Sequence, residues 1–154
     1  MFKNSQTLTR AVLIAALSLG AFGLAAPAWA QDAPVGLWKS IDDETKQPKA
    51  LIRIAEKDGL LTGTIEKLIN PTEPDPKCDK CTDDRKGKPV QGMTILTGLR
   101  RLDGDWGDGQ ILDPNNGKVY RAKAKLIEGG KKLEVRGFIG IALLGRTQTW
   151  LREE

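Results

Sequence analysis

The sequence contains no histidine and very little serine. Without histidine, neither Ser-His-Asp nor Cys-His catalysis can be built, and the commonest general base and metal ligand are missing. Serine occurs only at Ser5, Ser18 and Ser40. We therefore expect a protein that is not an enzyme, with no catalytic residues, no metal and no cofactor.

A strong excess of charge of one sign is also lacking. The chain has 24 basic and 20 acidic residues, and the two signs are interspersed along it. Nucleic-acid-binding proteins instead gather basic residues on one face or in one stripe. We expect no nucleic-acid partner.

The first thirty residues differ from the rest. Lys3 and Arg10 flank a polar start, an apolar run over 11–26 follows, and Ala28-Trp29-Ala30 is a small-x-small cleavage motif. This pattern is typical of a secretory signal peptide. An uncleaved membrane anchor is the alternative, but the run is rich in alanine and glycine. We expect a signal peptide at 1–30, cleavage near Ala30, one domain at 31–154, no membrane span after cleavage, and a periplasmic or secreted location.

The sequence after the leader alternates apolar and polar residues with a period of two, which is typical of half-buried β-strands. Between 117 and 127, for example, Tyr120, Ala122 and Ala124 alternate with Arg121 and Lys123. Turns rich in Gly, Asn and Asp separate such runs. The predicted strands are 36–41, 49–56, 60–69, 93–102, 109–113, 117–127, 131–139 and 145–152.

Most links between these strands are too short for parallel crossovers, so neighbouring strands should be antiparallel. Closure into a barrel hides the edges of such a sheet. The sequence therefore predicts an all-β fold, a closed or nearly closed antiparallel up-and-down barrel of about eight strands. A two-sheet sandwich is the alternative. One link, 70–91, is long and rich in proline, and it contains both cysteines.

The Cys78-Asp79-Lys80-Cys81 motif lies in this long loop. In an oxidising compartment, two such cysteines are expected to form a structural disulfide. Thiol–disulfide exchange is an alternative, but it usually needs the first cysteine at a helix N-terminus. Metal binding is another, but two thiolates fill only half of a tetrahedral site.

The segment from Asp103 to Gly109 contains three aspartates separated by glycines and Trp106. We interpret it as a hairpin turn. A calcium loop is the alternative, but the spacing does not fit an EF-hand.

If the barrel encloses a cavity, some of its large aromatic residues should line it together with a few polar groups. An inward arginine would suit a carboxylate or phosphate head group. Core packing is the alternative for the aromatics, and the alternation leaves open which strand face points inward. The candidate ligand-binding residues are Trp106, Tyr120, Arg136, Phe138, Arg146, Gln148 and Trp150.

Two motifs lie at the ends of the predicted domain. Gly36-Leu37-Trp38 opens the first strand and Arg152 closes the last. This pair resembles the lipocalin and calycin pattern, in which the arginine packs across the tryptophan and closes the barrel by a cation–π contact. The resemblance implies that Trp38 and Arg152 close the barrel.

A wider set of motifs resembles a family of exported bacterial proteins known as domain of unknown function 2147. The set comprises Asn70-Pro71, Cys78-x-x-Cys81, Pro89 with Gly92, Ile111 to Pro114 with Asn116-Gly117-Lys118 and Tyr120, Leu133 with Val135-Arg136-Gly137, and Gly145 to Trp150. The resemblance implies a lipocalin-like barrel in the cell envelope. It brings no established activity and therefore no catalytic residues.

These observations favour an exported lipocalin-like protein that binds a small amphiphilic or hydrophobic molecule. The first alternative is an envelope protein that docks a protein partner through the 70–91 loop. The second is a thiol–disulfide protein that uses Cys78 and Cys81.

Overall fold

The computed structural model describes residues 32–154, so the predicted signal peptide at 1–30 lies outside the described residues. The described chain forms eight strands and one short 3-10 turn. They are β1 (Gly36–Ile41), β2 (Pro48–Lys57), β3 (Leu60–Leu68), β4 (Thr94–Leu102), β5 (Asp105–Asp113), β6 (Lys118–Ile127), β7 (Lys132–Phe138), the turn η2 (Ala142–Leu144) and β8 (Arg146–Arg152).

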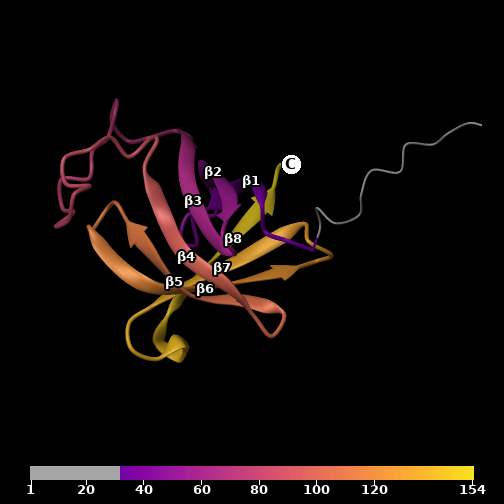
Figure 1. Ribbon diagram of the computed structural model, residues 1–154. Helices are drawn as coiled ribbons and strands as arrows, with labels where there is room; N and C mark the ends of the chain where they lie inside the picture. The colour runs from indigo at the N-terminus through magenta and orange to yellow at the C-terminus, as the bar shows by residue number, and fades with distance from the viewer. Residues whose placement is uncertain (1–31) are drawn as a thin grey trace, which may run out of the picture.

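The strands follow one another around a closed barrel in sequence order, from β1 to β8 (Figure 1). Every neighbouring pair is antiparallel, and β8 returns to pair with β1, with Trp38 opposite Arg152 and Ser40 opposite Trp150. The predicted all-β, closed, antiparallel barrel is confirmed, and the alternative of a two-sheet sandwich is wrong.

The residues that alternate along each strand in the sequence point alternately into and out of the barrel. On β6, Ala122 and Ala124 are buried while Arg121 and Lys123 are exposed. A strand that faces a core on one side and water on the other shows this pattern. The predicted strand ranges therefore match the observed strands closely, with one exception.

The exception is β5, which begins at Asp105 rather than at 109. The expected hairpin turn over 103–109 is therefore wrong in extent, because only Asp103 and Gly104 form the turn. Gly107 and Gly109 lie within the strand because side chains of β4 cross them. A Cβ at Gly109 would lie 2.7 Å from Cγ of Leu99, so glycine is needed there and the period-two pattern is lost.

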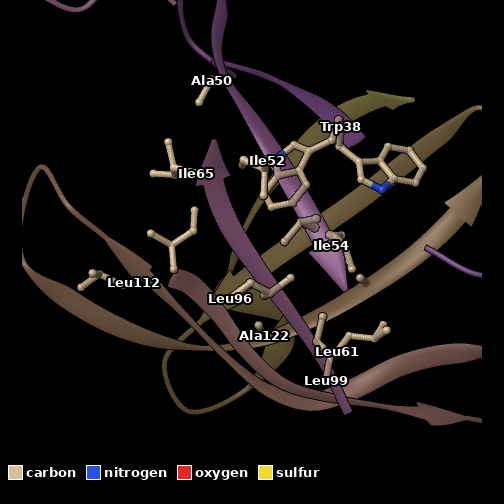
Figure 2. Packing of buried hydrophobic residues seen from close by; sticks show 14 of the residues in the cluster. Trp38, Ala50, Ile52, Ile54, Leu61, Ile65, Leu96, Leu99, Leu112 and Ala122 are labelled. Atoms are coloured by element: carbon tan, nitrogen blue, oxygen red, sulfur yellow. The ribbon is translucent and has the colours of Figure 1, made fainter. Parts of the chain in front are cut away.

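The hydrophobic core includes the interior of the barrel at the end where the β2–β3, β4–β5 and β6–β7 hairpins turn and where β8 ends, and Figure 2 shows part of this core. Trp38 and Trp150 are fully buried, and the Trp38 indole N–H donates to the carbonyl of Pro34 at 2.8 Å. Figure 2 shows Ile52 and Ile54 of β2 beside Trp38. We call this end of the barrel the closed end.

Arg152 seals the closed end. Its guanidinium lies over the Trp38 ring, 4.3 Å from the ring centroid. It also donates to the carbonyls of Gly130 at 2.6 Å, Ala33 at 2.8 Å and Val35 at 3.0 Å. One side chain of β8 thereby ties together the N-terminal segment, the β6–β7 turn and the first strand.

We predict that Arg152→Lys lowers the free energy of unfolding by about 1–2 kcal/mol, because a lysine cannot form the planar fork that reaches all three carbonyls. Urea unfolding would measure the loss. Arg53→Lys is the control, since Arg53 forms exposed surface ion pairs with Glu66 and Glu154 and should matter little. Equal effects of the two substitutions would contradict the assigned role of Arg152.

Candidate ligand-binding cavity at the open end of the barrel

The opposite end of the barrel, which we call the open end, contains a cavity of about 640 Å³. The β3–β4, β5–β6 and β7–β8 connections surround it, together with the ends of β1 and β2 at Ser40 and Lys49. Its walls are mostly aliphatic side chains from the inner strand faces, namely Ala50, Ile52, Ile65, Ile95, Ile111 and Val135. Polar groups join the lining at strand ends and loops, so the cavity is apolar inside and polar at its rim.

Strand β8 contributes three residues of one face. Arg146, Gln148 and Trp150 all line the cavity, in order from the rim toward the core. The Trp150 indole N–H donates to Oε1 of Gln148 at 3.3 Å. This hydrogen bond satisfies the buried indole N–H and leaves the side-chain NH₂ group of Gln148 available to donate to a ligand.

The charge of Arg146 is already balanced by the β1–β2 turn. Its guanidinium forms a two-pronged contact with the Asp43 carboxylate and a further ion pair with Glu44 at 3.1 Å. The hydrogen bond from Arg146 lowers the pKa of Asp43. An anionic ligand at Arg146 would therefore have to displace a carboxylate that is already in place.

The β1–β2 turn is itself fixed by Asp42. The carboxylate accepts the backbone N–H groups of Thr45 at 2.8 Å and Glu44 at 3.0 Å, and also the Thr45 hydroxyl at 3.1 Å. These hydrogen bonds, with the Thr45 N–H as the largest cause, lower the pKa of Asp42 to about 2. The Asp42 carboxylate, which fixes the turn that holds Arg146, thus stays ionised over the physiological pH range.

A second polar group comes from the β5–β6 turn. The Asn116 side-chain amide donates to Asp113 and to the Tyr120 hydroxyl oxygen, both at 3.0 Å. Tyr120 accepts this bond, and no described residue accepts its own proton. Because Tyr120 lines the cavity, its O–H can donate to a polar group of a ligand.

Five of the seven predicted ligand-binding residues border the cavity: Tyr120, Phe138, Arg146, Gln148 and Trp150. Trp106 lies elsewhere, next to the β4–β5 turn at the closed end, where the Arg101 guanidinium is 5.1 Å from its ring centroid. We leave Trp106 out of the site.

Arg136 also lies away from the cavity. Val135 of the same strand is buried inside the barrel, so the next residue points outward. The guanidinium of Arg136 donates to the carbonyls of Ala142 at 2.6 Å and Leu143 at 2.9 Å, and to the Thr147 hydroxyl at 2.6 Å. Arg136 therefore shapes the β7–β8 loop and is not part of the site.

The aliphatic walls of the cavity were not predicted from the sequence. Ile52, Ile65, Ile95 and Ile111 were not among the candidates, which favoured aromatic and polar residues. The signal that could have found them is the apolar face of the predicted strands, which supplies most of the surface of any barrel cavity.

The β3–β4 connection, residues 69–93, covers one side of the open end. Cys78 and Cys81 form a disulfide within it and are almost completely buried. Backbone hydrogen bonds order the loop, from Cys78 to the Lys88 carbonyl at 2.9 Å and from Val90 to the Pro76 carbonyl at 2.8 Å. The loop contributes Pro76 and Val90 to the cavity lining, so it is part of the site.

Residues 32–154 contain neither a cluster of metal-ligating residues nor a membrane-spanning helix. No group of three or more acidic, cysteine or histidine residues in this range could hold a metal ion. No helix in this part of the chain is long and apolar enough to cross a membrane.

Comparison with known proteins agrees with this fold. Residues 36–152 match the family model DUF2147, described as an uncharacterized protein conserved in bacteria. The chain belongs to the DUF2147 family. This confirms the resemblance inferred from the sequence motifs. The comparison with curated proteins finds no match.

A solved structure also resembles the chain. It is protein HP1028 from the human pathogen Helicobacter pylori, described as belonging to the lipocalin family. The TM-score is 0.69 at 15% identity, over 79% of this chain and 84% of that one. At this identity the likeness shows the fold: this DUF2147 protein has a lipocalin-like barrel.

The β3–β4 connection, which we call the disulfide loop, packs directly on the β5–β6 turn, and Gly117 permits this contact. Its φ is +71°, and a Cβ there would lie 2.0 Å from the Lys80 carbonyl oxygen. Gly59 has a similar φ of +76°, but a Cβ there would meet nothing within 4 Å. The two glycines therefore share the same backbone conformation, but only Gly117 lies against another segment of the chain.

We predict that Gly59→Ala costs about 1 kcal/mol of unfolding free energy, from backbone strain alone. Gly117→Ala should cost about 2 kcal/mol or more, because the loop must also move. Urea unfolding would measure both losses, and hydrogen exchange should show weaker protection at Cys78 and Gly87 only in Gly117→Ala. Equal losses and unchanged exchange would contradict the packing described here.

Proposed function

We propose that this protein is exported and binds one small amphiphilic molecule in the cavity at the open end of the barrel. The observation that carries the proposal is the cavity itself, which is closed by the core at one end, aliphatic in its walls and polar at its rim. Its volume of about 640 Å³ falls within the usual range for small-molecule sites, about 300–1,000 Å³.

The rim favours a particular head group. Tyr120 and Gln148 offer hydrogen bonds without a net charge, whereas Arg146 is occupied by Asp43. An acyl or similar chain would lie among the isoleucines of the walls. We therefore propose a ligand whose polar group is uncharged or zwitterionic rather than a simple carboxylate.

Export is supported by two independent features. The sequence of residues 1–30 has the pattern of a signal peptide. The Cys78–Cys81 disulfide belongs to a class of bond that persists in oxidising compartments such as the bacterial periplasm. We propose a periplasmic or secreted location on these grounds.

The alternatives from the sequence receive less support. Thiol–disulfide exchange needs an accessible sulfur, and the exposed fractions of Cys78 and Cys81 are 0% and 1%. Docking of a protein partner through the 70–91 loop has no specific observation in its favour, whereas five residues of this loop line the cavity: Asn70, Pro71, Thr72, Pro76 and Val90.

The cavity can be blocked at Ile65, a wall residue with an exposed fraction of 4%. We predict that a monoacylglycerol or lysophosphatidylcholine raises the Tm of the protein by several degrees, because binding to the folded state at about 100 times Kd adds about 2.7 kcal/mol. A fatty acid should raise it less. Ile65→Trp should remove these shifts, because the indole fills the cavity.

Val119→Trp is the matched control, since Val119 is exposed on the outer face of β6 and should leave the shifts unchanged. The near-ultraviolet circular dichroism of each variant would show that it is folded. The proposal fails if no amphiphile raises the Tm of the wild-type protein, or if folded Ile65→Trp responds as the wild type does.

A further inference from the structure

The β7–β8 loop presents an unusual group of exposed apolar side chains. The exposed fractions are 66% for Ile139, 61% for Ile141, 82% for Leu143 and 78% for Leu144. Residues 137–145 contain no charged side chain. Single exposed apolar residues are normal on a protein surface, but a contiguous group marks an interaction site. We call residues 139–145 the apolar loop.

The apolar loop is held in place with its side chains outward. Arg136 binds the carbonyls of Ala142 and Leu143 from the barrel side, and Arg121 reaches the Gly140 carbonyl at 3.5 Å. The turn η2 forms the tip, closed by the bond from the Gly145 N–H to the Ala142 carbonyl at 3.2 Å. In Figure 1 this yellow loop projects away from the barrel. The exposure of its side chains is therefore built into the fold.

Basic residues on the outer barrel wall accompany the apolar loop. Arg121, Lys123 and Lys125 point outward from β6, and Arg136 lies opposite Lys123 on β7. Within residues 32–154, none of these four side chains forms a salt bridge with a carboxylate. On the other side of the loop, Asp43 and Glu44 are paired with Arg146. Farther from the loop, Glu134 of β7 lies opposite Lys125 and partly compensates its charge. Nearer the loop, Arg121 and Lys123 have no carboxylate opposite them on β7, so the loop adjoins a basic part of the wall.

We propose that the apolar loop docks this protein on an anionic phospholipid bilayer. Ile141, Leu143 and Leu144 would enter the boundary between head groups and acyl chains, while Arg121 and Lys123 would lie against the lipid phosphates. Apolar residues beside basic ones are the pattern by which proteins bind a membrane surface without crossing it. A narrow, protruding tip fits into a fluid bilayer, whereas a protein partner would need a pocket of matching shape.

The docked orientation has a consequence for the cavity. Ile139 and Leu144 both border the cavity and belong to the apolar loop. Docking would therefore bring the open end of the barrel beside the bilayer, where a lipid-like ligand could pass between the two. This consequence rests on the proposed function, whereas docking itself does not.

The test is co-sedimentation of the chain from Gln31 onward with vesicles of phosphatidylglycerol or of phosphatidylcholine. We expect binding to phosphatidylglycerol and weaker binding to phosphatidylcholine. The double substitution Leu143→Ser with Leu144→Ser should weaken binding about a hundredfold, since removing each leucine from the interface costs about a factor of ten. Lys123→Glu should also weaken it and reduce its dependence on salt.

Leu60→Ser is the matched control, because Leu60 is 44% exposed in the β2–β3 hairpin at the closed end, away from the apolar loop. It should bind as the wild type does. An unchanged Tm in the double variant would show that the fold is intact, as expected for side chains that are mostly exposed. A single substitution, Leu143→Ser, serves if the double variant does not fold.

Failure of the wild-type chain to bind phosphatidylglycerol vesicles would overturn the proposal, including a result in which it binds only a protein. Unchanged binding by the leucine variants, or equal binding to both lipids, would overturn it as well. Ile65→Trp separates the two proposals. It should dock like the wild type even though its cavity is filled. A wild-type chain that binds the vesicles but whose Tm no amphiphile raises would refute only the proposed function.

Discussion

The contact between Arg152 and Trp38 is the constraint on which the rest of the structure depends. A barrel closed by pairing its first strand with its last needs something to hold that pairing, and β1 and β8 share three residue pairs. At this point Arg152 stacks on the Trp38 ring and donates hydrogen bonds to three backbone carbonyls. Because this end is sealed and filled by the core, the interior opens only at the opposite end.

The loops of the open end then decide what the cavity can hold. Asp42 fixes the β1–β2 turn, and this turn places Asp43 against Arg146, so the rim carries balanced charge and neutral donors. The disulfide loop packs on Gly117 and covers one side. The β7–β8 loop, on another side, is the part of the rim whose apolar residues face water. The outward side chains of this loop carry the proposed docking on an anionic bilayer and do not hold the ligand of the cavity.

Most of the fold could be predicted from the sequence because a strand with one face in the core shows its alternation directly, as β6 does at Ala122 and Lys123. The start of β5 could not, because Gly107 and Gly109 are set by the side chains of β4 that cross them. The residues of the site were harder to predict than the strands. Arg136 was expected in the cavity, but the direction of its side chain follows from Val135 facing inward, which the alternation alone left undecided. The exposure of Leu143 depends on hydrogen bonds from Arg136 that no local pattern encodes.

The central claim is that the barrel holds one small amphiphile in its open-end cavity. Native mass spectrometry of the protein, purified from its own cells without detergent, tests this most directly. We predict a single non-covalent adduct on the disulfide-bonded chain in the wild-type protein and in Val119→Trp, and none in Ile65→Trp. The bare oxidised chain in every preparation, even after incubation with a lipid extract of the same cells, would contradict it.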